Sequence, residues 1–114
     1  MGSFILSMGG KVNSAITNVK REKLLEILRG FSKQGSDYNY MILTASDIEP
    51  VDGCSYIRVE FKNLFYKVEV KFDFEKYGYK TKNIYEVENI LEDFLLRSRA
   101  PDVKKWGWEE QSDF

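Results

Sequence analysis

The sequence predicts a single α+β domain in which a helix, three antiparallel strands and a second helix follow one another, with both helices on one face of the sheet. Two stretches near the ends of the chain have apolar residues at helical spacing, and the stretches between them are rich in β-forming residues. A chain of 114 residues suits one domain that folds without disulfides. We therefore expect the domain over residues 12–100, with a flexible arm before it (1–11) and an irregular tail after it (101–114).

The first helix is expected over residues 18–32. Apolar residues recur there on one face, among them Leu24, Leu28 and Phe31. Asn18 is a candidate N-cap, and a glycine follows the expected end. Since the apolar spacing continues back to Val12, the start of the helix stays open. The preceding residues contain a Gly-Gly pair and are predicted to be flexible.

The centre of the chain predicts three strands, of which the last two form a hairpin. The first strand is expected over residues 38–45, which are rich in β-forming side chains. If Asn63 and Leu64 form the turn of the hairpin, apolar residues pair on one face and opposite charges pair on the other. Leu64 is unfavourable at the positive φ of a tight turn, so a wider loop with the same register is an alternative. The predicted pairs are Phe61 with Tyr66, Val59 with Val68, Ile57 with Val70, Glu60 with Lys67 and Arg58 with Glu69.

The second helix is expected to follow a loop over residues 76–82 and to end at Ala100 and Pro101. Asn83 and Glu86 have the spacing of a capping box, although Asn replaces the usual Ser or Thr. The apolar stripe of this helix consists of Ile84, Val87, Leu91, Phe94 and Leu95.

The residue types that dominate catalysis are scarce in this chain. There is no histidine, and Cys54 is the only cysteine. This excludes Ser–His–Asp and Cys–His nucleophiles and nearly every zinc site built from nitrogen and sulfur ligands. We therefore expect no enzymatic activity, no cofactor and no metal. The single cysteine favours a reducing, cytoplasmic compartment, and no apolar run is long enough for a membrane span.

Two features predict a surface for a protein partner. The tail carries two tryptophans separated by a glycine, and tryptophan is enriched in binding hot spots. Acidic residues of the second helix and the tail would form a negative surface that attracts a basic partner. The ordinary alternative is that the rings anchor the tail on its own domain and the acids form a solvated helix face. The candidate residues are Trp106, Trp108, Glu109, Glu110, Glu88, Glu92 and Asp93.

The function expected from these features is that of a non-catalytic inhibitor or immunity-type, antitoxin-like protein that binds and blocks a protein partner through an acidic and aromatic surface. Small size, missing catalytic residues and charge segregation all favour this class. The chain is basic over residues 1–36 and 61–82, and acidic over residues 37–60 and 83–114. Self-association through the uncovered sheet face, giving a homo-oligomer, is a further possibility.

An alternative function is nucleic-acid binding through lysines that alternate with tyrosines before the second helix. Such residues can hold phosphates and stack on bases, although the net charge of −1 weighs against a simple nucleic-acid-coating protein. The candidates are Lys76, Lys80 and Lys82 in the loop, and Lys20, Arg21 and Lys23 in the first helix.

The element order over residues 18–98 resembles the double-stranded-RNA-binding domain. That family places a lysine cluster at the start of its second helix, where Lys80 and Lys82 could correspond. The lysine-alanine signature of the family is missing, and Glu86 stands in the first turn instead. The resemblance lies in topology, and it implies binding of double-stranded RNA.

Overall fold

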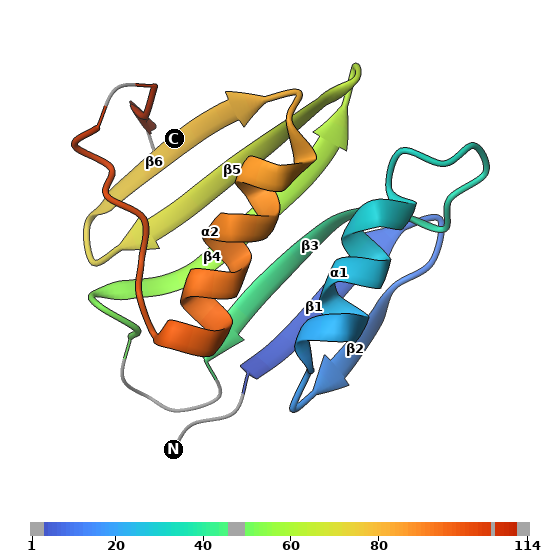
Figure 1. Ribbon diagram of the computed structural model, residues 1–114, viewed down its shortest axis with the longest axis horizontal. Helices are drawn as coiled ribbons and strands as arrows, with labels where there is room; N and C mark the ends of the chain where they lie inside the picture. Colours follow the sequence, from blue (N-terminus) through green and yellow to red (C-terminus); the bar gives the residue numbers. More distant parts are fainter. Residues whose placement is uncertain (1–3, 46–49, 106, 112–114) are drawn as a thin grey trace.

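The computed structural model describes residues 4–45, 50–105 and 107–111. In these residues the strands form one antiparallel sheet in the order β2-β1-β3-β4-β5-β6-β7, and both helices lie on one of its faces (Figure 1). The radius of gyration of 13.2 Å matches the ~13 Å expected for one domain of about this length. The elements in chain order are β1 (Phe4–Gly10), β2 (Ser14–Thr17), α1 (Arg21–Gly30), β3 (Tyr38–Ala45), β4 (Cys54–Lys62), β5 (Phe65–Phe72), β6 (Glu75–Thr81), α2 (Ile84–Arg97) and β7 (Glu109–Gln111).

The predicted three-stranded sheet is wrong, because the sheet has seven strands. β1 and β2 occupy the expected arm and the open start of the first helix, β6 occupies the expected loop, and β7 lies in the expected tail. The helix–strand–strand–strand–helix order therefore does not exist in this chain. With it goes the topological resemblance to the double-stranded-RNA-binding domain.

β1 is an interior strand of the sheet, because it pairs with β2 on one side and with β3 on the other. Its side chains alternate between the two faces, so that Phe4, Leu6 and Met8 are buried beneath the helices. The Gly-Gly pair makes a bulge at the end of the strand rather than a flexible joint. Gly10 has φ +153°, and a Cβ there would lie 2.8 Å from the carbonyl oxygen of Asp37.

The predicted β4–β5 register is confirmed at all five pairs. The alternative of a wider loop is wrong, since Asn63 and Leu64 form the two-residue turn with φ values of +54° and +68°. β6 extends the same ladder, and it places Tyr77 opposite Val70 and Tyr79 opposite Val68. The side chains of β6 therefore alternate as in a strand with one buried face, and Tyr77 and Tyr79 lie on that face.

α2 begins where the capping residue predicts, whereas α1 is shorter than expected. The Asn83 side chain accepts a hydrogen bond of 3.0 Å from the Tyr85 backbone N–H. Asn18 is not a cap, because α1 starts three residues later and Asn18 adopts a left-handed φ of +55° in the turn after β2.

The core lies between the sheet and the two helices. Leu24 and Leu28 of α1 and Leu91 and Phe94 of α2 are fully buried against the inner face of the sheet, and the Phe94 ring meets Phe4 edge-on at 5.5 Å. In the part of the chain that the structure describes, no helix is long and apolar enough to cross a membrane. Among the described residues, no helix lies on the opposite face of the sheet (Figure 1).

Candidate interaction surface

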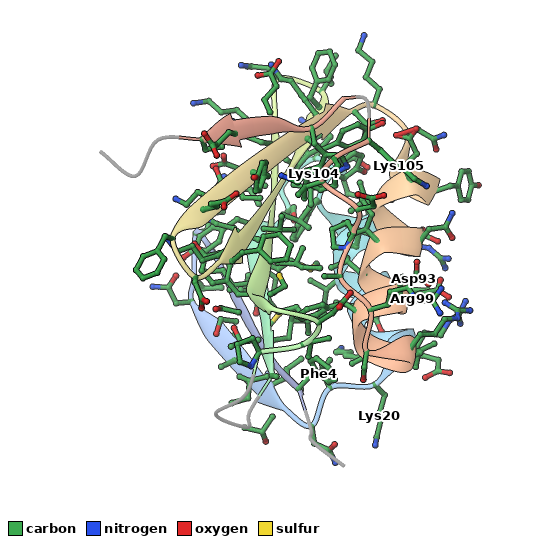
Figure 2. All side chains as sticks on the ribbon, turned by 90° about the vertical axis from the view of Figure 1, so that its left-hand side faces the viewer. Phe4, Lys20, Asp93, Arg99, Lys104 and Lys105 are labelled. Atoms are coloured by element: carbon green, nitrogen blue, oxygen red, sulfur yellow. The ribbon has the colours of Figure 1, made fainter. Side chains whose placement is uncertain are left out.

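The acidic residues predicted on the second helix are engaged in ion pairs within the domain. Glu88 pairs with Arg29 of α1, Glu92 pairs with Arg21 of α1 at 3.2 Å, and Asp93 pairs with Arg97 one turn along α2 at 2.8 Å. Asp93 lies on the outer side of α2 (Figure 2). These pairs neutralise much of the negative surface that the sequence predicts on α2.

Glu88 fastens the two helices together. Its residue is only 6% exposed, and both of its oxygens accept hydrogen bonds from the Arg29 guanidinium, from Nε at 3.0 Å and Nη2 at 3.1 Å. The hydrogen bond to Glu88 raises the pKa of Arg29 above its ordinary value. This geometry makes Glu88 a structural residue of the helix pair.

Trp108 anchors the tail on the sheet, while Trp106 lies outside the described residues. The half-buried Trp108 ring stacks on Tyr79 of β6 with 5.2 Å between ring centroids and 27° between planes. Tyr79 donates a hydrogen bond of 3.0 Å to Glu86, and this bond raises the pKa of Tyr79. Gly107 allows the close passage of the tail, because a Cβ there would lie 2.7 Å from the Tyr79 ring.

Glu109 and Glu110 are exposed on β7, the edge strand that pairs with β6. Glu88 and Glu92 instead face α1, so the structure does not bring the acids of the tail and of α2 into one patch. Two open hollows flank the tail and share Tyr79. One, of about 580 Å³, is lined by Lys67, Gly78, Tyr79, Lys80, Gly107, Glu109 and Gln111, and the other, of about 430 Å³, by Tyr79, Glu86, Asn89, Ile90, Pro101, Asp102, Lys105 and Trp108.

The sheet face without helices, called the helix-free face below, carries a different set of side chains. The strand registers place on it the aromatic and apolar residues Ile5, Tyr40, Ile42, Tyr56 and Phe65, the cations Arg58, Lys62, Lys67, Lys71, Lys76 and Lys80, and the acids Glu60, Glu69 and Glu109. Cations thus outnumber acids on this face, although the whole chain has a net charge of −1. The sequence interpretation missed this surface because it placed β1 and β6 outside the sheet.

Side chains at the centre of the helix-free face are held by their neighbours. The Tyr40 side chain covers Gly9, where an added Cβ would clash with the tyrosine hydroxyl and with two carbons of its ring. The Arg58 guanidinium lies 5.0 Å from the centroid of the Tyr40 ring and 3.7 Å from Glu60. Tyr40 and Arg58 are therefore held by contacts within the protein itself.

The alternative nucleic-acid-binding residues fall into two separate groups. Lys76 and Lys80 lie on the helix-free face, and Lys82 follows β6 directly before α2 begins. Lys20 and Arg21 line a hollow together with Leu95 and Leu96 of α2. Figure 2 shows Lys20 beside the end of this helix. Arg21 pairs with Glu92, and Lys23 pairs with Glu26 at 3.4 Å. The structure thus places Lys82 and the basic start of α1 at opposite ends of α2, and it places Lys76 and Lys80 on the sheet face away from both helices.

Cys54 has the environment of a structural thiol. It is fully buried, burial raises its pKa to about 11, and Sγ donates to the Tyr56 carbonyl at 3.2 Å. Within residues 4–45, 50–105 and 107–111, no group of three Cys, Asp or Glu side chains is arranged to hold a metal ion.

Comparisons with protein-family models, with curated proteins and with solved structures give no match for this chain. The function is therefore inferred from the geometry of the helix-free face and of the tail.

Proposed function

We propose that this protein is a non-catalytic module that binds and blocks a protein partner, and that the partner contacts the helix-free face. The observation that carries the proposal is the group of half-buried aromatic and cationic side chains on this face, with Tyr40, Tyr56 and Arg58 at its centre. Tyrosine and arginine are enriched among residues that dominate the affinity of protein interfaces.

The mixture of side chains on this face favours a protein over a polyanion. Ile42 lies two residues from Tyr40 along β3 and diagonally across from Tyr56, and Ile5 of β1 lies opposite Thr44, so part of the face offers apolar contact area. Glu60 and Glu69 stand among the cations, where they would repel a phosphate backbone. Side chains that the protein itself holds lose little conformational entropy on binding, and this suits an inhibitor or immunity-type protein that covers the working surface of its partner. We also place this interaction in the cytoplasm, because a single cysteine favours a reducing compartment.

The ion pairs of Glu88, Glu92 and Asp93 are the reason for choosing the helix-free face over the acidic helix as the contact surface. Trp108 has a structural role, because its ring stacks on Tyr79 on the helix side of the sheet. Glu109 belongs to both surfaces, because β7 borders the helix-free face.

The test is affinity capture from nuclease-treated lysate on the immobilised protein and on two variants. Tyr56→Ser removes a ring from the helix-free face, and Tyr85→Ser removes a 69% exposed ring from α2 as the matched control. We expect one stoichiometric protein to be retained by the wild type and by Tyr85→Ser, and lost by Tyr56→Ser. Equal retention by both variants would contradict the choice of surface.

A second candidate function, nucleic-acid binding, is favoured by one observation. Lys67 lies directly opposite Lys80, and Lys71 lies directly opposite Lys76, so four lysines share one part of the helix-free face. The same capture without nuclease separates the two functions. Nucleic acid in the eluate, with retention that falls steeply as salt rises, would favour this second function.

A further inference from the structure

Two pairs of lysines face each other across β5 and β6. Lys67 is the direct partner of Lys80, and Lys71 is the direct partner of Lys76. Like charges in such positions disfavour the sheet. Glu69 lies between the pairs, 3.4 Å from the Lys67 ammonium and 4.0 Å from that of Lys76. The two lysine pairs concentrate positive charge along β5 and β6, and this arrangement suits an anionic partner.

Two lysines lie beside the ring of Phe65 at one end of the β5–β6 pair. The ammonium groups of Lys80 and Lys82 lie 4.9 Å and 5.0 Å from the centroid of the Phe65 ring. Attraction to the ring holds both groups beside Phe65, and Lys80 lies directly opposite Lys67. The result is a local concentration of positive charge beside the β4–β5 turn.

The turn itself presents an exposed leucine. Leu64 is 73% exposed and has φ +68°, a backbone conformation that favours Gly or Asn. Neither solvent exposure nor backbone geometry therefore explains a leucine at this position. Local departures from folding preference of this kind are expected at functional sites.

A small hollow lies beside the turn, between Phe65 and two of these lysines. It has a volume of about 180 Å³ and is lined by Glu60, Lys62, Asn63, Phe65, Lys67 and Lys80. Binding sites for drug-sized molecules are usually larger, about 300–1,000 Å³. This hollow suits a single side chain that belongs to a larger partner.

We infer that Lys62, Leu64, Phe65, Lys67, Lys80 and Lys82, called the hairpin-tip site below, receive an acidic protein segment with an apolar residue beside its carboxylates. The inference rests on the proposed function and adds the chemistry of the partner. Charge complementarity selects carboxylates for the lysines, and Leu64 offers a contact for the apolar residue. The exposed Leu64 side chain favours a protein segment with an apolar residue over a phosphate backbone, which has no aliphatic group to place against it.

The experiment is an NMR titration of the full-length, ¹⁵N-labelled protein with a short synthetic peptide of glutamates that contains one leucine. We expect amide shifts at residues 62–67 and 80–82. Lys80→Glu should weaken binding by about tenfold, because it reverses one charge of the site. The control Lys33→Glu changes an exposed lysine beyond α1 and should leave the affinity unchanged. Lys80→Glu replaces the like-charge pair with Lys67 by an opposite-charge pair, so the melting temperature of this variant should not fall below that of the wild type.

Three outcomes would overturn the inference: shifts confined to other surfaces, equal weakening by Lys80→Glu and Lys33→Glu, or binding of oligothymidylate but not of the peptide at these residues. The capture experiment keeps the two proposals apart. If the partner is lost by Tyr56→Ser but is retained fully by Lys80→Glu, the hairpin-tip site is refuted and the proposed function is not. If the peptide binds at residues 62–67 but the Tyr56→Ser variant captures the partner as well as the wild type does, only the proposed contact surface around Tyr56 is refuted.

Discussion

The strongest test of the fold is the substitution Leu6→Ala. Leu6 lies in β1 between Ile16 of β2 and Leu43 of β3, and its side chain is fully buried. Leu→Ala changes at sites that cannot collapse cost about 2.7–5 kcal/mol, from lost transfer free energy and from the cavity that remains. Flanking strands on both sides hinder collapse, so we expect a loss of about 3 kcal/mol in the free energy of unfolding, from a total of about 5–15 kcal/mol.

Urea denaturation followed by circular dichroism measures this loss, and thermal melting should show a fall of roughly 12 °C. Ile5→Ala is the matched control, because Ile5 is the next residue of β1 and lies half-buried on the helix-free face. Its loss should be much smaller, about 1 kcal/mol. A loss below about 1 kcal/mol for Leu6→Ala would refute an interior β1 and restore the flexible arm that the sequence predicts.

Three further predictions concern the tail, the thiol and the helix-free face. Trp108→Ala should remove the stack on Tyr79 and lower the free energy of unfolding by about 1–2 kcal/mol, as measured by urea denaturation. An unchanged denaturation midpoint would contradict the anchoring role of the ring. The Cys54 thiol should resist Ellman's reagent at neutral pH until urea is added. Since burial raises its pKa from 9.0 to about 11, its contribution to stability should be complete below pH 9 and decline as the pH rises toward 11, and prompt labelling of the native protein would contradict the buried site. Gly9→Ala should destabilise the protein through a clash with the Tyr40 ring, and Tyr40→Ala in the same chain should recover part of the loss if that contact is the cause.

The elements with strong local patterns were predictable from the sequence. β3 has the expected bounds, the β4–β5 register is confirmed, and the Asn83 cap marks the start of α2. Each of these rests on neighbouring residues, either through alternation across one turn or through a side chain that caps its own helix. The turn type was not predictable in the same way, because Leu64 adopts a conformation that its side chain disfavours.

The missing strands depend on distant partners. β1 alternates Phe4, Leu6 and Met8 inward, but its pairing with β3 joins residues far apart in the chain, and the Gly-Gly pair suggested flexibility. β6 shows inward Tyr77 and Tyr79, yet its lysines and glycine are typical of a loop. One signal was available: continuing the β4–β5 register through a two-residue turn at 73–74 sets Tyr77 against Val70 and Tyr79 against Val68.

The candidate site was harder to predict, because a charge acquires its role from what lies across from it. Glu88 looks like a surface acid in the sequence, and only the packing of α1 on α2 shows that Arg29 neutralises it. Lys80 looks like a loop cation, and only the β5–β6 pairing sets it opposite Lys67. Composition gave the number of charges on α2 and β6, whereas topology decided which of them a partner can meet.

The alternation of charge along the chain acquires a spatial meaning in the fold. The basic segment 61–82 contributes most of the cations of the helix-free face, while the acids of α2 lie across the sheet and pair with arginines. A chain with a net charge of −1 thus carries a positive face that can orient an acidic partner before contact. Such steering acts on the association rate and is screened within about 8 Å at physiological salt. If the hairpin-tip site guides the partner, salt should slow association strongly and change dissociation little, since the apolar contacts at Leu64 and Ile42 persist once the complex has formed.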